Sequence, residues 1–331
     1  MGSEINVIRA RNIADIKKYL FKVGSAVASD IGVETDVSMV TVHSIIKDLL
    51  KEGSITEGEN VQKGVGRPAL EYKFNYDYQT SLLVSVIWKP KKVDLQFVGE
   101  VVNLSGEVQA HMTKDLEENT IEEFLQFFDE FYRQFPNVDN IGVMIPGKIH
   151  KGVVLSGWTD GHRGWKMEET LFKRTGKPIF IQNDAHLITV GYCINENIPT
   201  SEMIVGIFHP SAGKPGITIY TNEHLIEGKD SLAGEGKFLP QYMYGEPSKS
   251  YDEVVDHLLN ILPFYNVALA PHRFILSIDS MSKNKVLTPI QENQVLKDQI
   301  NHPKFEYIQN FFPMSRMGLR WLINRDTPYE L

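Results

Sequence analysis

The feature that most constrains the fold is the alternation of strand-like and helix-like segments beyond residue 81. Apolar runs such as NIGVMIPG (140–147) and KPIFIQND (177–184) predict buried strands, because they are short and end on turn-forming residues. Between such runs lies TIEEFLQFFDEFYRQF (120–135), whose apolar residues recur at helical spacing and whose Thr120 and Glu123 predict a capping box. Strands that alternate with helices predict an α/β fold.

The C-terminal half of this region repeats the theme. A helix is expected over 251–267, interrupted by Pro263, and further helices over 288–300 and 315–325. The pattern therefore predicts two α/β lobes, and a cleft between two lobes suits a small ligand. The strands expected in the second lobe are EMIVGIF (202–208), GITIYTN (216–222) and RFILSIDS (273–280).

The first 75 residues have a different pattern, which predicts three short helices. The first carries Ile13, Ile16 and Leu20 on one face, and SAVASDIG (25–32) predicts the second, with Val27 and Ile31 inward. The third is expected to begin after Ser38. Three short helices in this order are typical of a helix-turn-helix. The polar side of the third helix could meet base edges in a major groove or form a solvated face. Our candidate DNA contacts on this helix are Ser38, Met39, Thr41, His43, Ser44 and Lys47.

A strand, a glycine-rich tip and a second strand follow over residues 52–75. Lys63 and Arg67 lie at the tip among glycines and before Pro68. Glycines let a backbone approach a duplex closely, and cations at such a tip contact phosphate or the minor groove. We therefore predict a winged helix-turn-helix, a DNA-binding domain over residues 1–75, with Lys63 and Arg67 as further DNA contacts.

Charge is unevenly distributed between the two regions. The chain has 34 Lys and Arg and 42 Asp and Glu, and residues 1–75 hold ten of each, which leaves 24 against 32 in the remainder. The acidic remainder is unsuited to nucleic acid, and the balanced N-terminal region would gain affinity from dimerisation. The single cysteine, Cys193, allows no internal disulfide and fits a reducing cytoplasm. No apolar run is long enough for a membrane span and no secretory signal is evident, so a soluble cytoplasmic protein is expected.

Several motifs occur in an order that resembles the ROK family of repressors and sugar kinases. They are GRPA (66–69), NLSGE (103–107), IGVMIPG (141–147), IQNDAHL (181–187) and LIEGKDSLAGE (225–235). The chain looks most similar to the repressor branch, which regulates N-acetylglucosamine and xylose use. The resemblance implies an actin-like ATPase fold over residues 76–331. Its first lobe would span about 76–184 plus the C-terminal helix, and its second lobe about 185–313.

The resemblance also implies sugar-binding roles for particular residues. Asp184 matches the base of the family kinases, and Asn183 and Glu235 match residues that hydrogen-bond sugar hydroxyls. Trp158 and Trp165 lie in a segment that borders the sugar in the family, so Trp165 is a candidate for stacking on a pyranose. We therefore predict effector binding by Asn183, Asp184, Glu235 and Trp165.

The family's nucleotide and metal motifs are not matched. Ser85, Ile87 and Trp88 stand where the kinases have an aspartate and two glycines, and Trp88 would obstruct a backbone that must wrap a phosphate. Lys214 and Pro215 separate the glycines of the second phosphate loop, and SIDS (277–280) replaces a later glycine pair. The zinc-binding histidine and cysteines are missing, with Phe238 near the histidine position. No cofactor and no metal are expected, and His162 and His186 are expected to be satisfied surface or cleft histidines.

The favoured hypothesis is a dimeric, DNA-binding transcriptional regulator, a repressor of carbohydrate metabolism genes, that is not an enzyme. Its kinase-like domain would sense a sugar or sugar-phosphate effector, and ligand closure of the two lobes would change the spacing of two operator-bound winged helices. A second hypothesis is an active sugar kinase with an accessory DNA-binding domain. A third is a regulator that has lost sugar binding and responds to another metabolite or to a protein partner.

Overall fold

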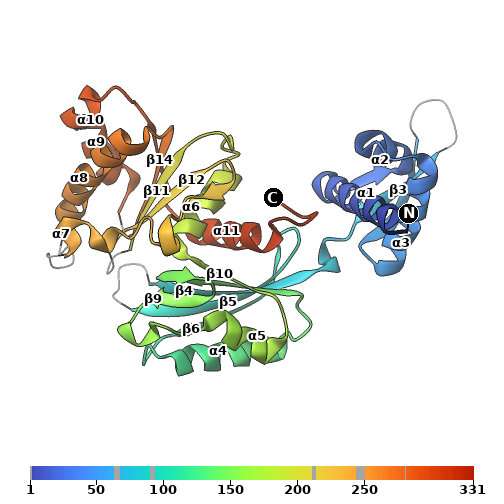
Figure 1. Ribbon diagram of the computed structural model, residues 1–331, viewed down its shortest axis with the longest axis horizontal. Helices are drawn as coiled ribbons and strands as arrows, with labels where there is room; N and C mark the ends of the chain where they lie inside the picture. Colours follow the sequence, from blue (N-terminus) through green and yellow to red (C-terminus); the bar gives the residue numbers. More distant parts are fainter. Residues whose placement is uncertain (1, 63–67, 90–93, 211–213, 244–249, 280) are drawn as a thin grey trace. The chain divides into compact units, whose positions relative to one another are not determined.

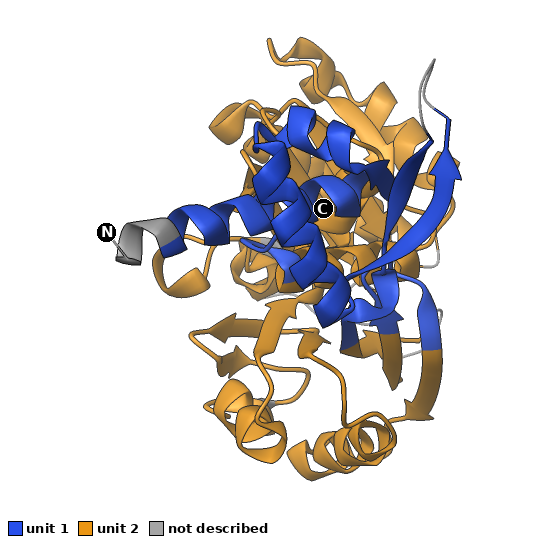
Figure 2. Ribbon diagram, turned by 90° about the vertical axis from the view of Figure 1, so that its right-hand side faces the viewer, with its two compact units in different colours: residues 1–81, 102–109, 324–331 blue, residues 82–101, 110–323 orange. Residues whose placement is uncertain are grey.

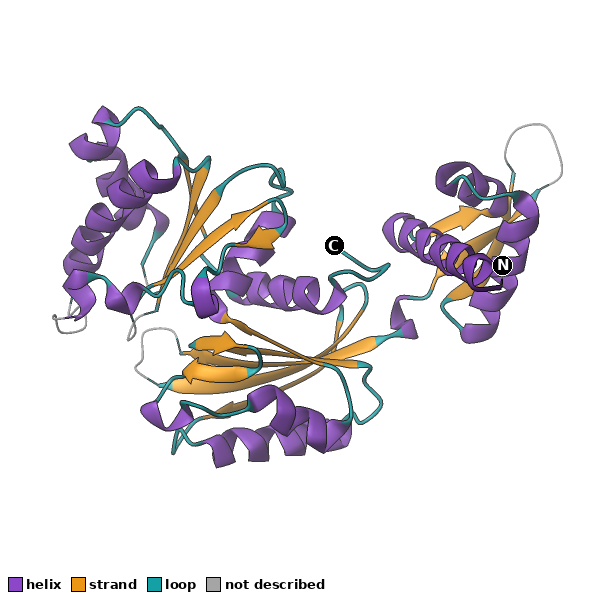
Figure 3. Cartoon of the chain, viewed as in Figure 1, coloured by secondary structure: helices purple, strands orange, loops and turns teal. Residues whose placement is uncertain are grey.

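The chain was analysed as a computed structural model that describes residues 2–62, 68–89, 94–210, 214–243, 250–279 and 281–331. It divides into two compact units (Figure 2). Unit 1 comprises residues 1–81, 102–109 and 324–331, and unit 2 comprises residues 82–101 and 110–323. Strands and helices alternate through unit 2 (Figure 3), so the α/β class predicted from the sequence is confirmed.

Unit 1 combines three helices with a three-stranded antiparallel sheet. The strand order is β1-β3-β2, and Ala26 pairs with Tyr72 while Ile55 pairs with Phe74. The second helix begins three residues later than predicted, because Ser25–Val27 pairs with β3 as a short strand instead of entering the helix. The elements are α1 (Gly2–Val23), β1 (Ser25–Val27), α2 (Ala28–Thr35), α3 (Met39–Glu52), β2 (Ile55–Val61), β3 (Ala69–Phe74) and η1 (Tyr76–Tyr78).

The core of unit 1 joins the inward faces of these helices to an aromatic cluster. The apolar residues predicted to face inward, among them Ile16, Leu20 and Ile31, are buried together there. Phe21 lies edge-on to both Phe74 and Tyr329, with ring centroids 5.6 and 5.7 Å apart. The extreme C-terminal segment is therefore part of this core, which the sequence pattern alone did not predict.

Unit 2 contains a first five-stranded sheet that is covered on one face by two helices (Figure 1). Its order is β10-β7-β4-β5-β6, and β10 runs parallel to β7 with Asn183 opposite Ile145. Four buried phenylalanines of α4 pack against the sheet, together with Met167 and Leu171 of α5. The elements are β4 (Thr80–Trp88), β5 (Leu95–Asn103), β6 (Val108–Asp115), α4 (Ile121–Gln134), β7 (Asn140–Ile145), α5 (Met167–Thr175) and β10 (Ile179–Asn183).

The predicted capping box at the start of α4 is half formed. Thr120 Oγ1 accepts a 3.2 Å hydrogen bond from the backbone amide of Glu123, as expected. The Glu123 carboxylate accepts from the amides of residues 117, 118 and 119 instead of from that of Thr120. This carboxylate therefore fixes the turn before the helix, in addition to the helix end itself.

The second five-stranded sheet of unit 2 has the order β13-β12-β11-β14-β15. Its β11 pairs antiparallel with β12 and parallel with β14. Helix α8 runs without interruption through Pro263, contrary to the prediction of a break, because the buried residues around the proline hold the helix against the core. The elements are β11 (Ile204–His209), β12 (Gly216–Thr221), β13 (His224–Leu225), α7 (Pro240–Met243), α8 (Tyr251–Leu269), β14 (Arg273–Ile278), α9 (Lys283–Glu292), α10 (Gln294–Asp298) and β15 (Lys304–Tyr307).

Two helices, α6 (Asp184–Asn195) and α11 (Phe312–Asn324), pack closely against each other and against the sheets. A Cβ added at Gly191 of α6 would lie 1.9 Å from the Met314 carbonyl oxygen of α11, so only glycine permits this contact. Helix α11 also packs on β7, where a Cβ at Gly142 would meet Ile323. Arg316 of α11 donates two hydrogen bonds to the Glu100 carboxylate of β5.

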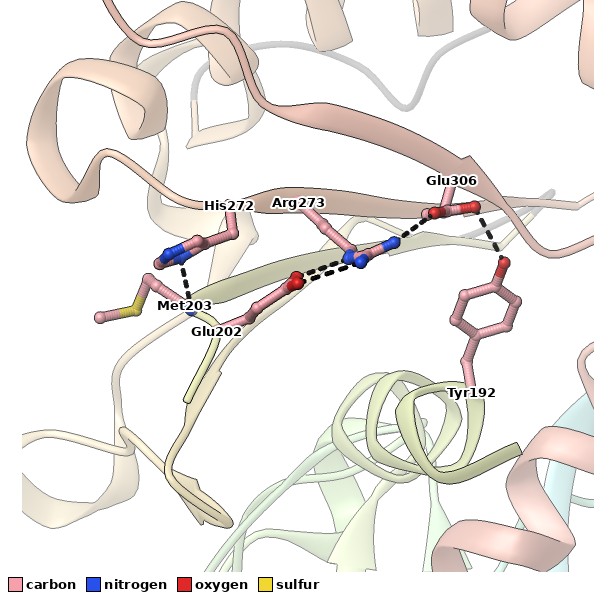
Figure 4. A network of polar contacts seen from close by, with 6 residues as sticks. All are labelled: Tyr192, Glu202, Met203, His272, Arg273 and Glu306. Carbon is pink, nitrogen blue, oxygen red and sulfur yellow. Dashed lines mark hydrogen bonds and ion pairs between the residues drawn. The ribbon is translucent and has the colours of Figure 1, made fainter. Parts of the chain in front are cut away.

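A polar network ties three elements of the second sheet region together (Figure 4). Arg273 at the start of β14 donates to both carboxylate oxygens of Glu202 and, at 2.8 Å, to Glu306 of β15. Tyr192 of α6 donates a 3.2 Å hydrogen bond to the other oxygen of Glu306. The network therefore joins the start of β14 to β15, to α6 and to the residue two positions before β11.

Short elements complete unit 2. The two-stranded ribbon β8-β9 follows β7 directly and includes the buried residue Lys148. No helix in the described ranges is both long and apolar enough to cross a membrane. The short elements are β8 (Lys148–His150), β9 (Val153–Ser156), η2 (Asp160–His162), η3 (Lys229–Ser231) and η4 (Gly236–Phe238).

Candidate functional site

A cavity of about 240 Å³ lies where the ends of β7 and β10 approach the start of β12 and the segment around residue 235. It brings together three of the four predicted effector-binding residues, Asn183, Asp184 and Glu235. Trp88 and Trp158 contribute aromatic walls, and Lys214 and Lys237 contribute cations. Hydroxyl-binding carboxylates beside aromatic faces form a surface that suits a polyhydroxylated ligand.

Asn183 occupies the junction between β10 and α6 and is fixed by hydrogen bonds on both sides. Its side-chain amide donates to the Gly147 carbonyl at 2.6 Å, and its Oδ1 accepts from the backbone amide of His186 at 3.3 Å. Asn183 is therefore the N-cap of α6. The Asn183 side chain also hydrogen-bonds the Asp184 carboxyl, which couples the two residues at the cavity wall.

Asp184 is buried and begins α6. Asn183 is the N-cap of this helix, so Asp184 is its first residue and does not cap it. Asp184 Oδ1 instead accepts a 2.8 Å hydrogen bond from the amide of Ala185. Burial, together with the nearby Glu235 carboxylate, raises the pKa of the Asp184 carboxyl to about 7. The side chain can thus exchange between a hydrogen-bond acceptor and a donor near neutral pH.

Glu235 is held against β12 by a close backbone approach. Gly216 forms an isolated antiparallel bridge with Glu235, and the amide of Ile217 donates to the Gly234 carbonyl at 2.9 Å. Gly234 has a φ of 82°, and a Cβ there would lie 1.8 Å from the Ile217 carbonyl oxygen, so glycine is required before Glu235. The Glu235 carboxylate pairs with Lys237 at 3.1 Å.

Sequence reasoning missed a buried pair beside this site, Lys148 and His186. The Lys148 amine lies 3.1 Å from His186 Nε2, and His186 Nδ1 lies 3.0 Å from the Thr218 hydroxyl. Burial, together with the adjacent Lys148 charge, lowers the pKa of His186 to about 3, so the ring is neutral. His186 was expected at a surface or cleft. The position of Lys148 directly after Pro146-Gly147 was the only available signal, and it carries no chemistry by itself.

Two of the segments that stand in place of the family's nucleotide motifs line the same cavity. Trp88 at the end of β4 forms part of its wall, as do Lys214, Pro215 and Gly216. A Cβ at Gly216 would lie 2.6 Å from Ala185 Cβ, so this glycine serves the contact between β12 and α6. Ser277 at the end of β14 is buried. Gly213 and Ser280 lie outside the described residues.

The remaining predicted residues of the sugar segment are placed differently. Trp165 does not line the cavity, because it is buried in the first-sheet core, where its ring lies 5.5 Å from that of Phe124. Trp158 lines the cavity instead and packs on His162, with ring centroids 4.0 Å apart and ring planes tilted by 34°. His162, expected at a surface or cleft, is fully buried, and burial lowers its pKa.

The DNA contacts predicted for the third helix lie at the start and along one face of α3. Met39, His43 and Lys47 are exposed. Ser38 is the N-cap of the helix, since its hydroxyl accepts from the amide of Thr41 at 3.4 Å. The Ser44 hydroxyl accepts a hydrogen bond from Arg9 of α1. Lys63 and Arg67 lie outside the described residues.

Potential metal ligands are scattered through the chain. Among the described residues no three His, Cys, Asp or Glu side chains gather closely enough to hold a metal ion. Phe238, at the position of the family histidine, is exposed and lines a second cavity together with Lys237. The described residues thus offer no donor set of the tetrahedral zinc type.

Comparison with protein families identifies the central part of the chain. Residues 91–238 match the sequence model of the ROK family. For this part of the chain, the family predicted from the motifs is confirmed. A comparison with curated protein sequences finds no match to the chain.

A solved structure of a transcriptional regulator and solved structures of sugar kinases share the fold. A ROK family transcriptional regulator, a homologue of the E. coli MLC protein, is 16% identical with a TM-score of 0.66, and the match covers 93% of this chain and 96% of that one. The Lmo2764 protein of Listeria monocytogenes, provisionally described as an N-acetylmannosamine kinase, is 14% identical with a TM-score of 0.61 over 75% of this chain and 99% of that one. A ROK family glucokinase from Streptomyces griseus, solved with glucose and AMPPNP, is 14% identical with a TM-score of 0.54, covering 73% and 99%. These likenesses establish the two-lobed sugar-kinase fold.

Proposed function

We propose that the protein is a cytoplasmic, dimeric transcriptional regulator whose ROK domain senses a carbohydrate and does not phosphorylate it. The single observation that carries this proposal is the set of residues that line the cavity of about 240 Å³. Asn183, Asp184 and Glu235 converge on it, while Trp88 stands where a kinase needs a glycine and Pro215 lies between the glycines of the second phosphate loop. The cavity retains sugar-binding chemistry without a phosphate-wrapping backbone.

The N-terminal unit supports the DNA-binding half of the proposal. Three helices and a three-stranded antiparallel sheet with the order β1-β3-β2 fit a winged helix-turn-helix. The match to the regulator structure covers 93% of the chain, so it must include most of the first 81 residues. The matches to the two kinase structures cover only 73% and 75% of the chain. Helix α3 would enter the major groove with its exposed face, including Met39, His43 and Lys47.

Two copies of the chain would read two half-sites of an operator. A dimer doubles the phosphate contacts and offsets the balanced charge of the N-terminal region. Effector binding must favour one arrangement of the lobes for the ligand to change DNA affinity. We propose that this coupling represses carbohydrate genes until the effector changes operator binding.

Selection from a random duplex pool tests the DNA-binding half directly. The full-length chain is expected to enrich a two-half-site sequence and to bind it at least about 100 times more tightly than a scrambled duplex at fixed salt. Lys47→Ala should weaken binding about tenfold, whereas Lys22→Ala, on an exposed part of α1, should leave it within about twofold. Failure to enrich any sequence across a range of salt concentrations would refute DNA recognition.

A coupled ADP-release assay tests the kinase alternative. Hexoses and amino sugars, each with ATP and Mg²⁺, are expected to give no turnover above the protein-free rate. Turnover that Asp184→Asn abolishes would assign the enzyme function instead, because the family base matches Asp184. A thermal-shift screen in which no sugar stabilises the chain would favour the third hypothesis, a regulator that responds to another ligand or to a protein.

A further inference from the structure

A second and larger cavity adjoins the first. Its volume is about 580 Å³, and it shares four lining residues with the first cavity: Ser156, Gly157, Glu235 and Lys237. One ligand could therefore extend from one cavity into the other past Glu235. Three cationic side chains line the second cavity: Lys148, Arg163 and Lys237. Glu235 is the one carboxylate among its described lining residues.

Lys148 is the buried cation of this cavity. Only 2% of the residue is exposed, and its amine donates to the Ala233 carbonyl and to His186 Nε2, both at 3.1 Å. An ammonium group has three donors, so one remains. Among the described residues no carboxylate forms an ion pair with this amine. Burial lowers the pKa of Lys148, and the more distant Glu235 and Glu227 carboxylates act in the opposite direction. Its nearest ring partner, His186, is neutral.

The charge of the lining is opposite to that of the chain. Lys237 is paired with Glu235, which leaves Lys148 and Arg163 without a direct carboxylate partner in the described ranges. The chain as a whole carries a formal net charge of −8. A buried cation without a paired anion is costly, and a site that retains one gains most from a negatively charged ligand.

We propose that the effector is an anionic carbohydrate whose negatively charged substituent, a phosphate monoester or a carboxylate, lies in the second cavity against Lys148. The sugar ring would lie in the first cavity, against Asn183, Asp184 and Glu235. Arg163, which is exposed, would bind the same substituent from the solvent side. This inference rests on the proposed carbohydrate-sensing function and names its ligand class.

The experiment compares matched ligands by calorimetric titration and thermal shift. Each hexose and each N-acetylhexosamine is tested beside its 6-phosphate, and each hexose also beside its uronate, with inorganic phosphate as a separate arm. At least one anionic derivative is expected to bind at least tenfold more tightly than its neutral parent. Phosphate and uronate arms distinguish the two sources of charge.

Variants then locate the anion. Lys148→Met should reduce affinity for the anionic ligand at least tenfold and change affinity for the neutral parent less than threefold. Lys148→Arg should recover part of the loss. If Lys148→Met does not fold, the exposed Arg163→Ala keeps the test open, with an expected loss of threefold or more. Lys297→Met, an exposed lysine of α10 outside both cavities, is the matched control and should bind as the unaltered chain does.

Each outcome decides the proposal. A neutral parent that binds as tightly as its derivatives, or anion binding that neither Lys148→Met nor Arg163→Ala weakens, overturns the inference and leaves carbohydrate sensing intact. Stabilisation by inorganic phosphate equal to that by the best sugar phosphate overturns the carbohydrate part. Binding of no sugar of either kind refutes the sensing function together with the inference.

Discussion

The side-chain amide of Asn183 donates a 2.6 Å hydrogen bond to the carbonyl oxygen of Gly147, 36 residues earlier in the chain. This bond joins the ends of two adjacent parallel strands, β7 and β10, at the edge where the cavity opens. Asn183 also caps α6, so one side chain positions the helix start and the cavity wall together. Backbone geometry at Gly147 is thus part of the site.

Substitution of Gly147 by alanine is expected to reduce the stability of the fold around the cavity. A Cβ there would lie 2.2 Å from the backbone oxygen of Ser156, which cannot move without displacing β9. Gly147→Ala should therefore lower the free energy of unfolding by about 2 kcal/mol or more in urea titrations. The control is Gly161→Ala, whose Cβ would meet only the Thr159 hydroxyl at 3.8 Å and should change it by less than about 1 kcal/mol. Equal effects of the two substitutions would contradict the close packing of Gly147.

Asp184→Asn is expected to alter the pH dependence of stability. The folded pKa of about 7 lies above the unfolded value of about 3.9, so the folded state holds the proton more tightly. The stability contributed by the neutral carboxyl is complete below about pH 4 and is lost as pH rises to about 7. The free energy of unfolding of the unaltered chain, relative to that of the variant, should fall by about 1–3 kcal/mol between pH 5 and pH 8.

Comparison of the two proteins at each pH is essential to that measurement. His186 and His209 have folded pKa values of about 3 and about 4, below the usual range, because both are buried. They add stability as pH rises towards their unfolded pKa, which opposes the effect of Asp184. Subtracting the variant removes the histidine contributions. A difference that stays constant from pH 5 to pH 8 would show that Asp184 is ionised throughout.

Local patterns predicted the parts of the site that lie next to each other in sequence. The apolar run before Asn183 and Asp184 indicated a strand followed by a helix, and the structure has this junction. The family resemblance supplied Glu235, which lies beside them although it is 51 residues beyond Asp184. Periodicity could not have placed it, because the bridge between Glu235 and Gly216 depends on tertiary packing.

The failures also have physical reasons. Lys148 and His186 were missed as a pair because each residue alone is ordinary, and only the fold buries them 3.1 Å apart. Trp165 was chosen over Trp158 for ligand stacking, yet Trp158 lines the cavity and Trp165 packs on Phe124. Two large aromatic residues in one loop are equivalent at the level of composition. The backbone path decides which one enters the core.

Cys193 is expected to be inert in the folded protein. Burial raises the pKa of its thiol to about 12, and only the thiolate reacts readily. At pH 8 a disulfide reagent such as dithionitrobenzoate should label the native chain at least about 100 times more slowly than a free cysteine, with a rate that follows opening of α6. In 6 M guanidinium chloride one thiol per chain should react at once, which provides the control. Rapid stoichiometric labelling of the native chain would show that α6 opens readily.

Arg273 is expected to stabilise unit 2 through the network of Figure 4. Its guanidinium joins Glu202 before β11 to Glu306 on β15, and all three side chains are largely buried, with exposures of 15%, 18% and 31%. Arg273→Met would leave two carboxylates without their cation and should reduce the free energy of unfolding by about 2 kcal/mol, measured by urea titration. Arg273→Lys should recover only part, since an ammonium lacks the planar fork that meets both partners.

The decisive control for the Arg273 prediction removes the stranded charges. The triple variant that combines Arg273→Met with Glu202→Gln and Glu306→Gln should regain about half or more of the lost stability, because a broken ion pair costs chiefly through its unpaired partner. Arg174→Ala, which breaks the more exposed pair with Asp129, should cost less than about 1 kcal/mol. A triple variant as unstable as Arg273→Met would mean that the arginine stem contributes by packing, and its charge would then be incidental to the fold.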